Sequence, residues 1–162
     1  MKVFLSYSSK DKDLARKIAY DLRNNDIDVW FDEWEIRVGE SITQKISQGL
    51  ENSDFVAVLL TINSINSGWV EKEWQSKIGQ EASEKKVAVL PLKADGCDIP
   101  QMLQDKLYAD ISSDYQEGFN KFLVSLEKYY RRALPSKKTN HWQQVLTIVI
   151  NHIPWKPLTH IK

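Results

Sequence analysis

Short apolar runs alternate with amphipathic stretches along most of this chain, and this alternation constrains its fold more than any other feature. The strongest run is Phe55–Leu60, six consecutive apolar residues that indicate a strand covered on both faces of a sheet. Further strands are expected at 3–5, 27–31 and 87–92, with a weak edge strand at 107–111.

Amphipathic helices are expected between these strands, at 12–24, 41–50, 69–84, 100–106 and 114–130. Asp11 is placed to cap the first of them. Residues 32–39 are expected to form a charged loop, and 63–68 a polar turn. Strands that alternate with helices predict an α/β fold of three layers, a parallel sheet with helices on both faces.

Composition excludes several classes of protein. The chain has 162 residues and one cysteine, Cys97, so it has no internal disulfide and a reducing compartment such as the cytoplasm is expected. The N-terminal apolar stretch is too short for a signal peptide, and no run is long enough to span a membrane. One Cys and three His without ligand spacing predict no metal site.

Charge divides the chain into an acidic body and a basic tail. Residues 1–127 carry 15 basic and all 22 acidic residues, whereas 128–162 carry seven basic residues and no acidic one. After a linker at 134–140, apolar residues at helical spacing predict an amphipathic helix from Trp142 to Ile153. This extension either docks on the body, or binds a partner or leads into a further domain. A membrane-surface or nucleic-acid arm is the least favoured interpretation, because the basic residues flank the apolar stripe.

The carboxyl ends of parallel strands are where such folds bind ligands. The segments to consider are therefore 6–10, 32–41, 61–68 and 93–99. No pair of glycines has the spacing of a nucleotide-binding loop, strand 3–5 does not end in an acidic cluster, and no GxSxG motif occurs. These absences disfavour a phosphate-loop protein, a phosphate-receiver domain and a serine hydrolase.

Trp69 and Glu73 lie four residues apart on the expected helix 69–84, so they share one face near its N-terminus. An aromatic plane beside an acid suits a substrate with a flat cationic ring and an adjacent ribose. The alternative is that Trp69 belongs to the core and Glu73 complements the helix dipole. Spacing alone leaves both interpretations open.

Three segments carry a resemblance to a known family: Val3–Asp11 (VFLSYSSKD), Val29–Ser41 (VWFDEWEIRVGES), and the stretch from Ser53 to Trp74. They resemble, in order, the first box, the second strand with the BB loop, and the third strand with the start of the αC helix of TIR (Toll/interleukin-1 receptor) domains, of the bacterial type. The resemblance covers residues 1–131 as one domain and leaves 132–162 as a basic linker and helical extension.

The resemblance implies a flavodoxin-like fold with five parallel strands. It also implies one of two functions. The first is NAD⁺ glycohydrolase activity, which cleaves the bond between nicotinamide and ribose to give ADP-ribose or a cyclic isomer, in bacterial defence signalling. The second is a non-catalytic adaptor that binds other TIR domains. NAD⁺ would be a substrate, and no cofactor is expected.

The resemblance further implies roles for individual residues. Glu73, the acid of a WxxxE pattern, is the expected catalytic residue, and Trp69 would stack on the nicotinamide ring. The other expected substrate-binding residues are Tyr7, Ser8, Asp32, Trp34, Arg37 and Ser67. Two of these have alternatives: Trp34 could anchor its loop to the body, and Arg37 could lie in solvent.

The segment around Gly39 departs from eukaryotic signalling TIR domains, because Val38 stands where those have proline. This departure disfavours a receptor adaptor. Catalytic family members commonly self-associate through this loop, so self-association is expected.

Overall fold

The computed structural model describes residues 1–66 and 89–133. The expected helix at 69–84, which carries Trp69 and Glu73, lies outside the described residues. Ser67 and the tail beyond 133 also lie outside them. The chain divides into two units, Met1–Tyr130 and Arg131–Lys162, and the sheet belongs to the first.

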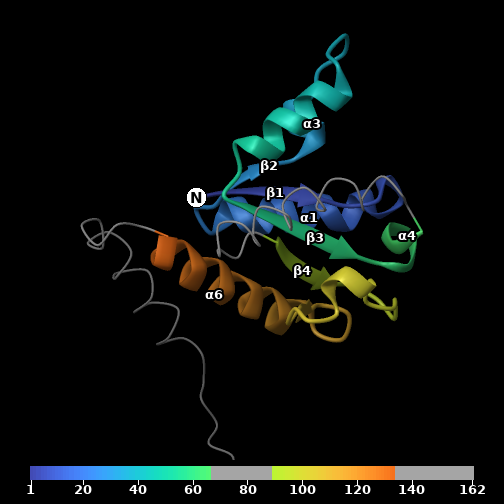
Figure 1. Ribbon diagram of the computed structural model, residues 1–162, viewed down its shortest axis with the longest axis vertical. Coiled ribbons are helices and arrows are strands. Elements are labelled where there is room, and N and C mark those ends of the chain that lie inside the picture. The colour runs from blue at the N-terminus through green and yellow to red at the C-terminus, as the bar shows by residue number, and fades with distance from the viewer. Residues whose placement is uncertain (67–88, 134–162) are drawn as a thin grey trace, which may run out of the picture. The chain divides into compact units, whose positions relative to one another are not determined.

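The sheet has five parallel strands in the order β2-β1-β3-β4-β5 (Figure 1). They are β1 (Lys2–Ser6), β2 (Asp28–Trp30), β3 (Phe55–Leu60), β4 (Val89–Lys93) and β5 (Ala109–Asp110). This is the strand order of flavodoxin-like doubly wound folds. It confirms the predicted α/β fold and places the apolar run of β3 in the middle of the sheet.

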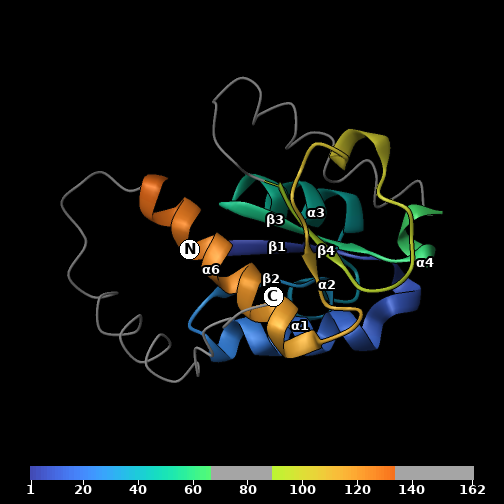
Figure 2. The same ribbon diagram turned by 90° about the horizontal axis from the view of Figure 1, so that it is seen from below.

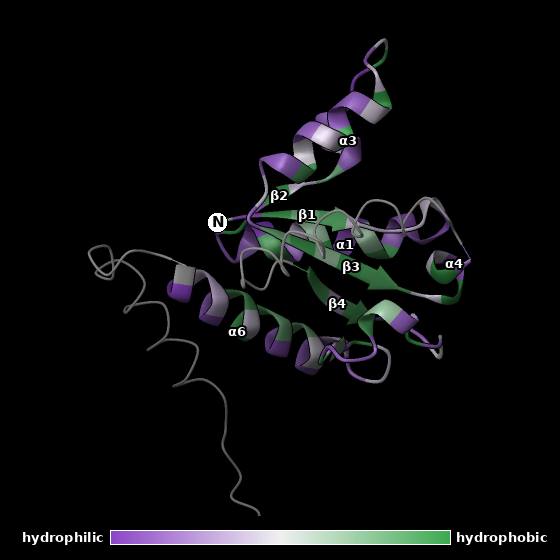
Figure 3. Cartoon of the chain, viewed as in Figure 1, coloured by the Kyte–Doolittle hydropathy of each residue, from purple (hydrophilic) through white to green (hydrophobic). Residues whose placement is uncertain are grey.

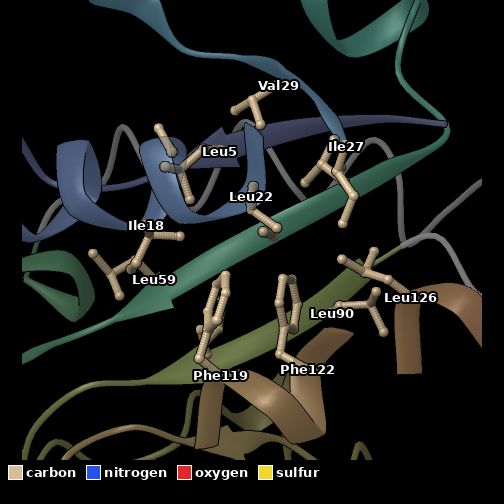
Figure 4. Packing of buried hydrophobic residues seen from close by; sticks show 14 of the residues in the cluster. Leu5, Ile18, Leu22, Ile27, Val29, Leu59, Leu90, Phe119, Phe122 and Leu126 are labelled. Atoms are coloured by element: carbon tan, nitrogen blue, oxygen red, sulfur yellow. The ribbon is translucent and has the colours of Figure 1, made fainter. Parts of the chain in front are cut away.

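Two long helices cover one face of the sheet, α1 (Lys12–Asn24) and α6 (Tyr115–Ala133). Residues of both helices pack into one core cluster with residues of β1 and β3, and Figure 2 shows α1 on the side of the strands away from α3 (Ile42–Glu51). The apolar stripe of α1 is buried except for Leu14, which is partly buried. On α6, Phe119 and Phe122 point at the sheet beside Leu126 (Figure 4). The alternation of hydrophobic and hydrophilic residues along α6 is visible in Figure 3.

Helix α3 (Ile42–Glu51) lies on the other face of the sheet (Figure 2). Ser41 caps it through a hydrogen bond from the Gln44 N–H to Oγ, at 3.4 Å. Its glycine, Gly49, lies against the ring of Trp30, so that an added Cβ would overlap the ring carbons. The Trp30 ring in turn stacks on Phe4 of β1, with centroids 4.4 Å apart.

Two segments expected to be loops contain short helices, which corrects the sequence prediction. The charged segment 32–39 begins with α2 (Asp32–Glu35), whose acidic residues suit the positive end of a helix. The polar segment 63–68 overlaps α4 (Ile62–Ile65), which starts with a reciprocal capping box between Thr61 and Ser64. In α4 this capping box offsets the lack of an apolar stripe, whereas α2 has no side-chain cap and the Asp32 side chain accepts the Glu33 N–H within its first turn.

The start of the first helix also differs from the prediction. A 3₁₀ turn, η1 (Ser9–Asp11), precedes α1, and Asp11 makes no capping hydrogen bond to it. The expected short helix near 100–106 is a second 3₁₀ turn, η2 (Gln101–Leu103). None of the helices in the described ranges is long and apolar enough to cross a membrane.

Candidate functional site

A cavity of about 210 Å³ lies beside the carboxyl ends of β1 and β2. Its polar lining consists of Tyr7, Ser8, Ser9 and Asp32. Its apolar lining consists of Phe4, Leu5, Trp30, Ile36, Ile42 and Ile46. No basic side chain is among the described residues that line it, so the one charged group there is a carboxylate.

The polar side of the cavity is organised by a hydrogen bond between its two neighbouring strands. Tyr7, which follows β1, donates its hydroxyl to Asp32 Oδ1 at 2.5 Å. Burial raises the pKa of Tyr7 far above that of a free phenol, and the bond to Asp32 raises it further, so Tyr7 stays protonated. The Glu33 N–H donates to the same Oδ1 at 2.9 Å. Within the described part of the chain, Asp32 Oδ2 is thus left for a ligand hydroxyl.

Ser8 lies in the same lining but is 6% exposed. Its hydroxyl accepts the Lys10 N–H at 3.4 Å, and its carbonyl accepts the Asp11 N–H at 2.8 Å. Ser8 therefore shapes the turn after β1 through both its side chain and its backbone.

Helix α2, which carries Asp32, is fixed to α1 by two anchors on the face away from the cavity. The first is Glu33, which accepts hydrogen bonds from Arg16 Nε at 3.0 Å and Nη2 at 3.1 Å, and pairs with Lys12 at 2.7 Å. These bonds, above all those from Arg16, hold the pKa of Glu33 below its usual range. Paired hydrogen bonds of this kind fix orientation as well as proximity.

The second anchor is Trp34. Its ring packs edge-on against Phe31 and Tyr20, at centroid distances of 5.0 and 5.2 Å, and the Arg23 guanidinium lies 3.7 Å from its centre. Trp34 is partly buried, packs against the core cluster that includes α1, and is not part of the cavity lining. Its placement therefore does not support the predicted substrate contact and fits the alternative, an anchor for the segment.

Arg37 is exposed and is likewise not part of the lining. Its backbone N–H donates to Glu40 Oε2 at 2.8 Å, and Glu40 also pairs with Lys45 at 2.8 Å. The turn between them contains Gly39 with φ of +95°, which glycine adopts without strain. The structure thus brings Tyr7, Ser8 and Asp32 together, and it holds Arg37 apart from them.

Two aspartates that the sequence analysis did not assign to the site connect the loops at this edge of the sheet. Asp11 accepts hydrogen bonds from Thr61 and Asn63, which follow β3. Asp95, after β4, accepts the Ile62 N–H at 2.9 Å at the start of α4. Asp11, just before α1, looks like a helix cap in the sequence, and Asp95 looks like an ordinary turn residue after β4, so no local signal could have distinguished these cross-strand roles.

Comparison with known proteins identifies the family. The model of the TIR domain family matches residues 3–124. The chain belongs to the TIR domain family. The resemblance drawn from its three sequence segments is thereby confirmed.

Two relatives have names that state an activity. One, "2′ cyclic ADP-D-ribose synthase BtTIR" of Bacteroides thetaiotaomicron, is 37% identical over 90 residues, which is 55% of this chain and 31% of that protein. Another, "NAD(+) hydrolase TirS" of Staphylococcus aureus, is 40% identical over 91 residues, 56% of this chain and 32% of that protein. The matched segment thus spans about a third of each relative's length.

Among solved structures, the TIR domain of the Toll-related receptor TRR-2 from Hydra magnipapillata has a TM-score of 0.66. The match covers 78% of this chain and 97% of that one at 17% identity, so it bears on the fold alone. Among the described residues, no group of three or more His, Cys, Asp and Glu side chains is arranged to hold a metal ion.

Proposed function

We propose that this TIR domain cleaves NAD⁺ between nicotinamide and ribose, and releases nicotinamide with ADP-ribose or a cyclic isomer. The observation that carries the proposal is the Tyr7–Asp32 pair beside an apolar wall at the carboxyl edge of the sheet. The names of the two relatives supply the reaction class.

The cleavage requires few catalytic groups from the protein. The bond between ribose C1′ and the nicotinamide nitrogen breaks with its electron pair on nitrogen, so nicotinamide leaves as a neutral molecule and needs no general acid. The ribose is left with a positive charge of the oxocarbenium kind, which a carboxylate stabilises. Water then attacks C1′ and loses a proton, or a nucleophilic atom of the same molecule attacks and closes a ring.

Glu73 is the carboxylate we assign to that cation, with Trp69 stacked on the nicotinamide ring and Ser67 beside them. All three lie outside the described residues, so their roles rest on the WxxxE pattern of the family. Asp32 would accept a ribose hydroxyl through Oδ2, and Tyr7 would hold Asp32 in place.

The size and lining of the cavity restrict what part of the substrate enters it. Ligand pockets are typically about 300–1,000 Å³, and this one has about 210 Å³. It therefore fits one ring with its ribose rather than a whole dinucleotide. Since no basic side chain is among its described lining residues, the pyrophosphate would lie outside it.

The first test is NAD⁺ consumption by the purified chain over a range of protein concentrations. The Glu73→Gln variant keeps the side-chain shape and is expected to lower turnover by about 100-fold or more, because it removes the charge that faces the cation. Glu71→Gln, two residues away on the expected solvent face, is the matched control. Full turnover by Glu73→Gln would disprove the assignment of the acid. No turnover by the wild type at any concentration would disprove the enzymatic function.

Self-association is part of the same proposal, through the segment around Gly39. Val38 is fully exposed at this turn, and Ile42 just after it is 58% exposed although it lines the cavity. A second copy docked here would cover both. Turnover per molecule is then expected to rise with protein concentration, and Val38→Asp is expected to abolish that rise.

We also propose a cytoplasmic role in bacterial defence signalling, with residues 132–162 as the place where a further partner binds.

A further inference from the structure

We propose that Asp11 is a positioning residue, which holds the loop after β1 and the loop after β3 at a fixed separation and thereby sets the geometry of the site. This inference rests on the proposed function for its catalytic consequence. The tie itself rests on contacts within the described residues.

The two carboxylate oxygens of Asp11 serve two different side chains. Oδ2 accepts the Thr61 hydroxyl at 2.6 Å, and Oδ1 accepts the Asn63 side-chain amide at 2.6 Å. Both partners lie about fifty residues along the chain, across β1 and β3. Asp11 is half-buried and gives no capping bond to its own helix, so its carboxylate is committed to this link. Hydrogen bonds to a charged group are about twice as strong as neutral ones.

Each end of the link is itself rigid. On the β1 side, the Asp11 N–H bonds to the Ser8 carbonyl at 2.8 Å, next to Tyr7. On the β3 side, Thr61 and Ser64 form the capping box of α4, with both side chains buried. Because each end is held by its own hydrogen bonds, a change at Asp11 is expected to alter the distance between the two loops rather than the conformation of one loop alone.

These two loops carry different parts of the proposed site. The first carries Tyr7 and Ser8, and the second leads along the chain into the segment that contains Ser67, Trp69 and Glu73. A misplacement of reacting groups by about 1 Å can cost about 100-fold in rate. The separation of these loops is therefore a quantity that the enzyme must control.

The chain offers a matched control in Asp21, on the same helix. Asp21 is also half-buried and also accepts two side-chain hydrogen bonds, from Tyr115 at 2.5 Å and from Lys17 at 2.8 Å. It joins α1 to α6, however, and not to the carboxyl edge of the sheet. Asp11→Ala and Asp21→Ala thus remove similar interactions from different places.

The experiment compares both variants in three measurements: melting temperature, kcat and KM for NAD⁺, and hydrogen exchange of peptides that cover residues 61–66. Similar losses of melting temperature are expected. Asp11→Ala is expected to lower kcat/KM by about 10- to 100-fold and to accelerate exchange in 61–66. Asp21→Ala is expected to change kcat/KM by less than about threefold and to leave that exchange unaltered.

Rescue by a conservative variant separates positioning from charge. Asn at position 11 accepts from Asn63 through its carbonyl and donates to Thr61 Oγ1 through its amide, so Asp11→Asn is expected to recover most of the activity. If Asp11→Ala does not fold, Asn63→Ala removes one of the two bonds from the other side and is expected to give an intermediate loss with faster exchange.

The outcomes distinguish the two proposals. Equal losses of kcat/KM in Asp11→Ala and Asp21→Ala, or unchanged exchange in 61–66, would overturn the role of Asp11. If the wild type cleaves no NAD⁺, the proposed function fails, and the exchange measurement alone decides whether Asp11 holds the two loops together.

Discussion

The helices on the two faces of the sheet differ in how deeply they bury their side chains. On one face α1 buries Ala15, Ile18, Ala19 and Leu22, all at 0% exposure. On the other, Gly49 is the one buried residue of α3, and Ile42 is 58% exposed. The cavity lies on this second face, between α3 and the strands.

This difference indicates a division of labour between the two faces. Closely packed interiors transmit any change of volume into stability, so the α1 and α6 face holds the fold together. Helix α3 is packed less deeply, although the strand residues beneath it are buried, so its side chains tolerate changes in packing more cheaply and remain accessible to a ligand. We therefore expect substitutions on the first face to act on stability and those on the second to act on binding.

The largest difference in unfolding free energy is expected when one leucine on each face is replaced by alanine. Leu22→Ala, in α1, removes a fully buried side chain, and such changes cost about 2–5 kcal/mol of unfolding free energy. Leu50→Ala, in α3, removes a half-buried one and is expected to cost about 1 kcal/mol. Urea denaturation of both variants measures the difference. Equal costs would show that α3 packs as tightly as α1.

A smaller effect is expected where the second face is tight. An Ala at position 49 would push its Cβ into the Trp30 ring, which stacks on Phe4 below the cavity. Overpacking of this kind costs about 1–3 kcal/mol. Because Trp30 lines the cavity, Gly49→Ala is expected to raise KM for NAD⁺ as well. Gly96→Ala, at a position with open space around it, is the control. A loss of stability with unchanged KM would contradict the division of labour.

The next effect concerns binding alone. Asp32→Asn keeps an acceptor for the Tyr7 hydroxyl but removes the charge beside the proposed ribose site. A rise of about tenfold in KM for NAD⁺ is expected, which corresponds to about 1.4 kcal/mol, with little change in melting temperature. Asp28→Asn, at the other end of β2, removes an exposed partner of Lys2 and should leave KM unaltered. If both variants have the same KM, Asp32 does not contact substrate.

The fold was predictable because its strands are set by continuous apolar runs. The six apolar side chains of Phe55–Leu60 are all removed from water only if the strand lies at the centre of a sheet. The amphipathic stretches on either side of it then leave few possible arrangements for the other strands. The short helices α2 and α4 could not be predicted in this way. Four residues make too short a helical stripe. What stabilises them is the capping box in α4 and, in α2, the contacts of Glu33 and Trp34 with α1.

The site was predictable only in part, for a related reason. Tyr7, Ser8 and Asp32 follow the ends of neighbouring parallel strands, so their proximity follows from the topology. Trp34 lies two residues beyond Asp32, and which face of the sheet it meets depends on the turn that α2 makes between them. Asp11 bonds to residues about fifty positions away, which no local pattern encodes.

The smallest effect is a dependence of the melting temperature on pH, which arises from Asp21 on the face that α1 and α6 cover. Burial by itself would raise the pKa of Asp21, but hydrogen bonds from Lys17 and Tyr115 outweigh it and hold this pKa below its usual range. A depressed pKa contributes stability above the unfolded value of about 3.9, and this contribution is lost as pH falls through the folded value. The melting temperature of wild type should thus exceed that of Asp21→Asn at neutral pH, and the difference should shrink below about pH 4. Asp13→Asn, at an exposed position of the same helix, controls for the loss of a surface charge. A difference that stays constant from pH 7 to strongly acidic conditions would show that Asp21 acts through packing and not through its charge.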